Sequence, residues 1–276
     1  MKKNSDKKPI WKNAGVRGVT ALILAGIVIL PIYFGGVYWA ILVSTFSARM
    51  IWEWVRMLNP RPVLSEICIP VAGIFLSCFF MAFENYNFVI ISVGLSIFLI
   101  SIERFNLNKV FWACLGFIYI CLPSIALIGL RGSEVGFSSE GFIKMCYIIL
   151  IVIGADVGAY LGGSYFKGPK LSPVISPNKT WSGFISGLTL GVILGGLTGY
   201  FVNMGLIFSL TFAVPIVLLS VVGDLFESGI KRVLKVKDTG ELLPGHGGLL
   251  DRLDSLMFAV LGSVIILYIA PDIWPI

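Results

Sequence analysis

The chain has 276 residues, of which 57% are hydrophobic and only 13% are charged, and its mean hydropathy is +0.92. Soluble domains carry about 25% charged residues, so this composition excludes an ordinary water-soluble protein and predicts a membrane protein. The formal net charge of +6 is explained below by membrane topology, and we therefore expect no nucleic-acid partner.

The N-terminal part of the chain is a basic arm, residues 1–18, followed by a long apolar stretch. The uncharged run over residues 19–48 is too long for the apolar region of a signal peptide, and it predicts two spans separated by a glycine pair. Arg49, Glu53 and Arg56 end the second span on one helical face, where i,i+4 and i,i+3 pairs can form.

Seven more apolar runs are about long enough to cross a bilayer as helices. They lie at about 66–83, 88–102, 111–130, 142–163, 182–202, 206–223 and 255–270. The sequence therefore predicts an all-α, polytopic membrane protein with about nine transmembrane helices. We expect one membrane domain, residues 1–276, made of the arm, N-terminal spans over 19–150, and spans with polar cytoplasmic loops over 151–276.

The basic residues indicate the orientation of these spans. If the N-terminus is cytoplasmic, all but Arg131 and Lys144 of the 21 lysine and arginine residues fall on the inside. The positive-inside rule therefore predicts a cytoplasmic N-terminus and an outside C-terminus.

The span at 182–202 carries a glycine at every fourth position. This spacing puts the glycines on one helix face, which is typical of close helix packing in a membrane and favours a structural role over a substrate role. They are Gly183, Gly187, Gly191, Gly195 and Gly199.

The number and spacing of the cysteine and histidine residues limit the kinds of metal site that the chain can form. The five cysteines are odd in number and have no CxxC spacing, so we expect reduced packing residues rather than disulfides or a zinc site. His246 is the only histidine, which excludes HExxH and multi-histidine sites. A metal would need carboxylates.

The most polar segment of the chain starts at Asp224 and ends at Asp254. Asp224, Glu227, Ser228 and Lys231 would share one face of a helix. A wet cytoplasmic loop would explain the lysines that follow, but it would not explain carboxylates at the membrane ends of two helices, where ionisable groups are expensive. The segment continues with Arg232, Lys237, Asp238, His246, Gly247, Gly248, Asp251, Arg252 and Asp254.

A second polar group precedes the glycine-bearing span. Asp156 lies inside an apolar run and should face polar protein or water, and an interhelical hydrogen bond is the alternative. Lys179 follows a proline turn, and it either takes part in the same site or simply marks the inside face.

These residue types predict chemistry on a phosphate. Carboxylate oxygens suit Mg²⁺, which usually binds one or two protein carboxylates plus substrate phosphates. Lysine and arginine complement phosphate charge, and glycine turns let backbone N–H groups approach it. The chain has no GxxxxGK[ST] motif and no kinase glycine loop. The pattern favours phosphoryl or nucleotidyl transfer.

The run from Ser228 to Asp254, with its Lys-Arg, Lys-Asp, His-Gly-Gly and Asp-Arg-Leu-Asp groups, resembles the signature of phosphatidate cytidylyltransferases, also called CDP-diacylglycerol synthases. The upstream Ser-Pro-Asn-Lys-Thr-Trp run over 176–181 is also similar to a family element. The resemblance covers nearly the whole chain and suits the bacterial type. Val157 and Ser164 depart from the family pattern.

The resemblance implies a reaction in which CTP and phosphatidic acid give CDP-diacylglycerol and pyrophosphate, with Mg²⁺ or another divalent ion. The expected partners are these substrates and membrane lipids, and the family allows a homodimer. The expected location is the bacterial inner membrane, with the site on the cytoplasmic side.

The resemblance and the residue chemistry together imply roles. Asp224 and Asp251 are the expected metal ligands, with Asp254 next. Lys231, Arg232 and Lys179 are expected to bind phosphates, and Ser228 a phosphate oxygen. Glu227 and Asp238 are expected to orient the basic residues, and His246 to contact phosphate or pass a proton to pyrophosphate. The other expected substrate-binding residues are Asp156, Lys237, Gly247, Gly248 and Arg252.

Three other functions remain open from the sequence. Two are enzymes that use another lipid phosphate as CMP acceptor or that phosphorylate a polyprenol with CTP. The third is a transporter, because charged residues in spans also mark ion pathways, although a transporter does not need the dense polar segment on one face.

Overall fold

The computed structural model describes residues 26–104, 106–240, 247–269 and 274. The described chain is mainly helical, and helix 26–34 is its first element. The named helices are α2 (Gly36–Leu58), α3 (Leu64–Ala82), α4 (Tyr86–Glu103), α5 (Leu107–Arg131), α6 (Glu140–Phe166), α7 (Trp181–Phe201), α8 (Leu206–Val233) and α9 (Leu250–Ile269).

Seven of these helices, α3 to α9, are long and apolar enough to cross a membrane, counted over the described residues. This confirms the expected all-α, multi-pass membrane fold. The seven helices correspond to the seven later predicted spans. The first predicted span lies partly outside the described residues, and the second corresponds to α2.

The ends of α2 and α8 follow the expected pattern, whereas the loop between α6 and α7 does not. Helices α2 and α8 continue past their apolar runs to Leu58 and Val233, as the expected helical faces around Glu53 and around Glu227 require. Some of their polar side chains pair inside the fold, such as Glu53 with Arg49 and Lys231 with Glu227. The loop between α6 and α7 contains an antiparallel hairpin, β1 (Lys170–Ser172) and β2 (Ser176–Thr180), which the sequence did not predict.

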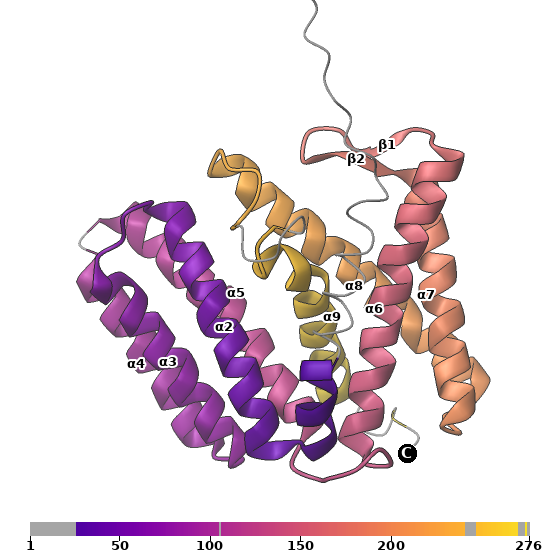
Figure 1. The fold of residues 1–276 in the computed structure, drawn as a ribbon, viewed down its shortest axis with the longest axis horizontal. Helices are drawn as coiled ribbons and strands as arrows, with labels where there is room; N and C mark the ends of the chain where they lie inside the picture. The colour runs from indigo at the N-terminus through magenta and orange to yellow at the C-terminus, as the bar shows by residue number, and fades with distance from the viewer. Residues whose placement is uncertain (1–25, 105, 241–246, 270–273, 275–276) are drawn as a thin grey trace, which may run out of the picture.

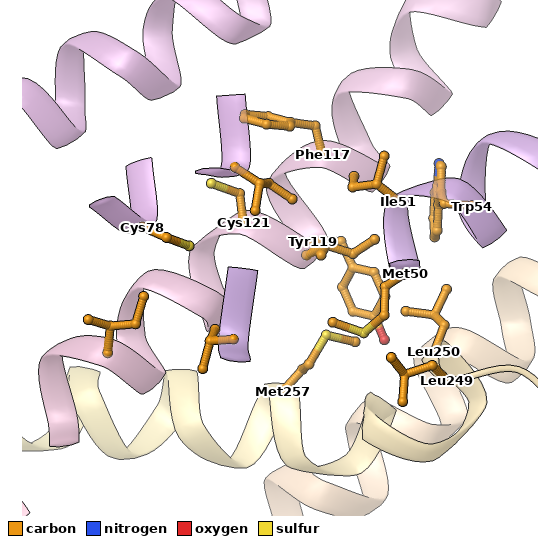
Figure 2. Close-up of a cluster of buried hydrophobic side chains, with 14 of the residues drawn as sticks. Met50, Ile51, Trp54, Cys78, Phe117, Tyr119, Cys121, Leu249, Leu250 and Met257 are labelled. Atoms are coloured by element: carbon orange, nitrogen blue, oxygen red, sulfur yellow. The ribbon is translucent and has the colours of Figure 1, made fainter. Parts of the chain in front are cut away.

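The helices form two groups joined by α8 and α9. Figure 1 shows α2 to α5 on one side, α6 and α7 on the other, and α9 with α8 between them. Buried side chains of α2 and α5, such as Trp54 and Phe117, belong to one cluster with Leu250 and Met257 of α9 (Figure 2). The start of α9 is therefore packed into the core of the N-terminal group.

The glycine face of α7 packs as expected against α6 and α8. All five glycines are buried. A Cβ atom on Gly187 would lie 2.6 Å from the backbone oxygen of Ala155, and one on Gly195 would lie 2.6 Å from Cβ of Ala213. The predicted structural role is confirmed, because these glycines allow three helix backbones to approach closely.

Arg131 is one of the two basic residues that fall on the outside in the predicted topology, and it has a structural role there. Its guanidinium is buried and donates hydrogen bonds to the backbone carbonyls of Ile32, Tyr33 and Glu134. Its charge therefore joins α5 to helix 26–34.

We predict that Gly187→Ala destabilises the protein, because the new methyl group would meet a backbone oxygen that cannot move alone. The melting temperature of the purified protein in detergent should fall by several degrees. Gly94→Ala in α4 is the matched control, since a Cβ there meets nothing within 4 Å. That control should leave the melting temperature unchanged or raise it, and equal losses in both variants would contradict the packing role.

Candidate active site

The two polar groups of the sequence meet in one cavity of about 790 Å³, near the hairpin. This volume lies within the range of small-molecule sites, about 300–1,000 Å³. Apolar side chains from α6, α7 and α8, such as Tyr160, Phe184 and Val221, form part of the wall. The predicted site residues in the lining are Asp156, Lys179, Asp224, Lys231, Asp238, Asp251, Arg252 and Asp254.

An ion pair joins the hairpin to α8 across this cavity. The ammonium group of Lys179, on β2, contacts the carboxylate of Asp224, on α8. Ser228, one turn further along α8, donates from Oγ to Oδ1 of Asp224 at 3.3 Å. Lys179 therefore belongs to the same site as Asp224, which favours the functional interpretation over a simple mark of the inside face.

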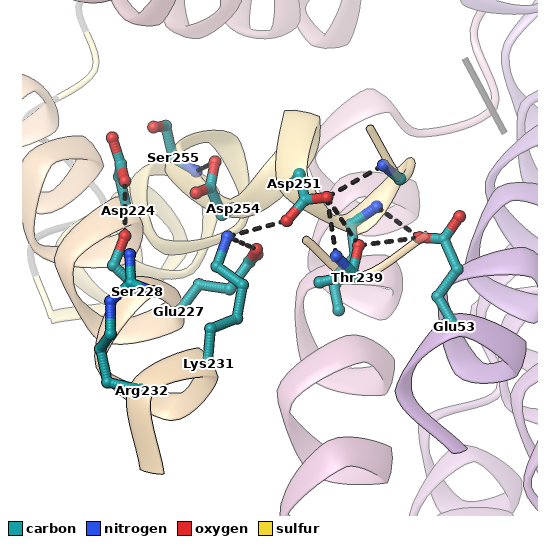
Figure 3. Close-up of polar contacts among 12 residues, drawn as sticks. Glu53, Asp224, Glu227, Ser228, Lys231, Arg232, Thr239, Asp251, Asp254 and Ser255 are labelled. Atoms are coloured by element: carbon teal, nitrogen blue, oxygen red, sulfur yellow. Dashed lines mark hydrogen bonds and ion pairs between the residues drawn. The ribbon is translucent and has the colours of Figure 1, made fainter. Parts of the chain in front are cut away.

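Lys231 lies between two carboxylates. Its Nζ is 2.9 Å from Oε1 of Glu227, one turn earlier in α8, and 2.7 Å from Oδ1 of Asp251 in α9 (Figure 3). Glu227 is fully buried, and Lys231 is nearly so. The contact with Glu227 is the one that the expected orienting role of Glu227 requires. The contact with Asp251 connects α8 to α9.

The second carboxylate oxygen of Asp251 accepts three hydrogen bonds. Oδ2 accepts from the backbone N–H of Thr239 at 3.0 Å, from its Oγ1 at 2.9 Å, and from the backbone N–H of Gly248 at 2.9 Å. Gly247 has φ of +85°, and a Cβ atom there would lie 3.0 Å from the same oxygen. The glycine pair therefore lets the backbone wrap closely around Asp251.

The cavity fits a divalent ion only if a substrate supplies part of its ligands. No group of three His, Cys, Asp or Glu side chains that could hold a metal was found in the described residues. Asp224 and Asp254 both line the cavity, beside Asp156, and Mg²⁺ often takes one or two carboxylates plus phosphate oxygens. The three protein contacts to Oδ2 of Asp251 would have to loosen for that oxygen to bind a metal.

Other predicted residues lie outside the cavity lining. Arg232 is exposed, and its Nε donates to the carbonyl of Ile175 in the hairpin at 3.2 Å. Lys237 is exposed in the segment after α8. The lining does not include Glu227, Ser228, Gly247 or Gly248. Glu227, Ser228 and Gly248 instead form hydrogen bonds with residues that do line the cavity. His246 lies outside the described residues, so its role stays a prediction.

Sequence reasoning missed the site contacts of Glu53 and Thr239. The expected pair with Arg49 is present at 3.3 Å, but Arg56 stacks on Trp52 instead of pairing with Glu53. Glu53 also accepts hydrogen bonds from the segment before α9 and from Thr239. The available signal was a carboxylate inside an apolar helix, which is costly without a buried partner.

Comparison with known proteins shows the family of the chain. The model of the cytidylyltransferase family matches residues 15–270. The phosphatidate cytidylyltransferase of Brucella suis biovar 1 (strain 1330) is 34% identical over 262 residues, which cover 90% of each chain. That of Helicobacter pylori (strain J99) is 30% identical over 95% of this chain and 94% of its own. That of Staphylococcus aureus (strain COL) is 46% identical over 51% of this chain and 55% of its own. The chain described here belongs to the cytidylyltransferase family.

Proposed function

We propose that the protein transfers the cytidylyl group of CTP to phosphatidic acid, giving CDP-diacylglycerol and pyrophosphate. A phosphate oxygen of the lipid attacks the α-phosphorus of CTP and forms the new P–O bond. The bond between the α-phosphorus and the oxygen that bridges it to the β-phosphorus breaks, and pyrophosphate leaves with that electron pair. Family membership and the names of the relatives support this reaction.

One observation carries the proposal beyond the names. Polar residues from two parts of the chain, separated by the glycine-bearing helix α7, line a single cavity in which lysines and carboxylates alternate. The cavity also has an apolar wall. Such a mixed cavity suits a substrate pair made of a nucleoside triphosphate and a lipid phosphate, because the charged groups and the acyl chains need different surroundings.

The lipid phosphate does not require a strong general base. The second pKa of a phosphate monoester is about 6, so the nucleophile is already largely ionised near neutral pH. The protein must instead bring two anions together. Lys179 and Arg252 line the cavity and would bind phosphate oxygens. Lys231 would add positive charge from a position fixed by Glu227 and Asp251.

Mg²⁺ or another divalent ion, when bound, would offset charge on the triphosphate and on the departing pyrophosphate. Asp224 and Asp254 would hold it together with substrate phosphate oxygens. Asp251 stays a predicted third ligand, which would first have to exchange a hydrogen bond to Thr239, Gly248 or Lys231.

We also infer that the cavity faces the cytoplasm of a bacterial inner membrane. The hairpin, the loop after α8 and the start of α9 carry lysines and arginines near the cavity, which the positive-inside rule assigns to the cytoplasmic side. This orientation would expose the site to cytoplasmic CTP.

The first test is an assay of the purified protein with phosphatidic acid, labelled CTP and Mg²⁺. We expect labelled CDP-diacylglycerol and pyrophosphate in equal amounts. Asp224→Ala should lower kcat/KM by about 100-fold or more, as loss of a group that organises transition-state charge does. The control Glu84→Gln, an exposed carboxylate outside the cavity lining, should keep the activity.

The same assay separates the competing functions. Chelation should abolish turnover, and added Mg²⁺ should restore it. Turnover with a polyprenol but not with phosphatidic acid would replace the proposal with a CTP-dependent kinase. If neither substrate reacts and the protein conducts ions in liposomes, the transporter function is correct.

We predict that Lys179→Gln lowers kcat/KM by about 10- to 100-fold, because a hydrogen bond to a charged group contributes about 1.5–3 kcal/mol. Lys170→Gln is the matched control, since Lys170 lies on the other strand of the hairpin, is exposed and does not line the cavity. Equal activity in both variants would remove Lys179 from the site.

The orientation can be tested with a membrane-impermeant maleimide. In Lys237→Cys the added thiol should react in inverted membrane vesicles but not in intact spheroplasts, measured above the labelling of the native chain. Glu84→Cys, in the loop between α3 and α4, should give the opposite result. The reverse pattern would place the cavity outside.

A further inference from the structure

A carboxylate of the N-terminal helix group is built into the support of the site. Glu53 lies in α2, has no exposed surface, and is paired with Arg49 at 3.3 Å. Its Oε1 accepts the backbone N–H of Leu249 at 3.1 Å, and its Oε2 accepts that of Leu250 at 2.9 Å. Figure 3 shows Glu53 facing the segment that carries Asp251.

These contacts provide acceptors for backbone N–H groups at the start of α9. The first N–H groups of a helix have no partner within the helix and need outside acceptors. Here three successive donors are used, because Gly248 donates to Asp251 while Leu249 and Leu250 donate to Glu53. Glu53 thus acts as a cap supplied by a distant helix, and it fixes where α9 begins.

Thr239 connects the two carboxylates from the other side. Its Oγ1 is 2.9 Å from Oδ2 of Asp251 and 3.3 Å from Oε2 of Glu53. A hydroxyl has a single proton, so the shorter contact to Asp251 is the hydrogen bond that forms more strongly. The Thr239 hydroxyl is therefore held between both acidic groups.

Two glycines of the polar segment leave the space that Glu53 occupies. A Cβ atom on Gly240 would lie 3.1 Å from Oε1 of Glu53, and one on Gly248 would lie 2.7 Å from Oε2 and 2.1 Å from Oγ1 of Thr239. Both positions pack against the side chain of Glu53 from α2, which leaves little room for a larger residue than glycine.

We propose that Glu53 is a positioning residue for the reaction: through the start of α9 and Thr239 it holds Asp251, and with it Lys231, in place in the cavity. The inference rests on the proposed function for its catalytic meaning. Glu53 does not line the cavity, so it acts through the residues that do.

The first test measures the hold on α9 without any substrate. In Glu53→Gln the amide group would point a donor at one of the two N–H groups, and the charge that pairs with Arg49 is lost. Hydrogen–deuterium exchange of the amides at 248–251 should become at least about tenfold faster, while α3 and α4 are unchanged.

The matched control is Glu66→Gln. Glu66 is also a largely buried carboxylate at a helix start, paired with Arg104 at 3.3 Å and accepting from the backbone of Val63, but it contacts no site residue. It should leave exchange at 248–251 and kcat unchanged. Unchanged exchange in Glu53→Gln would overturn the proposal whether or not the protein proves to be a cytidylyltransferase.

The second test separates positioning from loss of folded protein. Per folded molecule, kcat of Glu53→Gln should fall at least about tenfold with KM for CTP changed less than about threefold, because small misplacements of reacting groups cost rate. If Glu53 acts partly through Thr239, its effect should be smaller in a Thr239→Val background than in the native chain, whereas Glu66→Gln should combine independently.

The results distinguish the positioning role of Glu53 from the proposed function. A kcat within about twofold of the native chain would overturn the positioning role. Effects of Glu53→Gln and Thr239→Val that simply multiply would overturn the part of that role that depends on Thr239. If the native chain gives no CDP-lipid but exchange at 248–251 still rises in Glu53→Gln, the proposed function fails and the structural hold of Glu53 on α9 stands.

Discussion

The contact of one lysine with two carboxylates, in largely buried surroundings, is the interaction on which the site depends. Lys231 pairs with Glu227 within α8 and with Asp251 on α9, and the second of these ion pairs connects the two central helices. Breaking a buried pair by removing one partner costs about 3–5 kcal/mol, because the other charge is left without compensation. Each of the three groups therefore restricts where the others can lie.

Close helix packing supplies the opposite wall of the cavity. The glycine face of α7 lets α6 and α8 approach it, which brings Asp156 and the hairpin toward Asp224. Thr180 ends the hairpin and accepts the backbone N–H of Gly183 at 3.1 Å as α7 begins. The position of Lys179 is thus fixed by the same helix whose glycines set the packing distance.

The N-terminal helices have a part in the site as well as in the membrane anchor. The start of α9 is packed among Trp54 and other apolar side chains of α2 and α5, and Glu53 accepts its backbone donors. A carboxylate buried this deeply needs both charge compensation and hydrogen bonds. Arg49 provides the first, and the start of α9 provides the second.

The sequence by itself determined the membrane class, seven of the nine expected spans, the glycine packing face and the residues of both polar groups, because hydropathy, four-residue spacing and dense charge are local patterns. The tertiary structure alone decided that Lys179 contacts Asp224, that Asp251 is already surrounded by protein donors, and that Glu53 supports α9. Those facts depend on which helices are neighbours and on the direction of single side chains. Hydropathy averages over both, so it gave no sign of these contacts or of the hairpin.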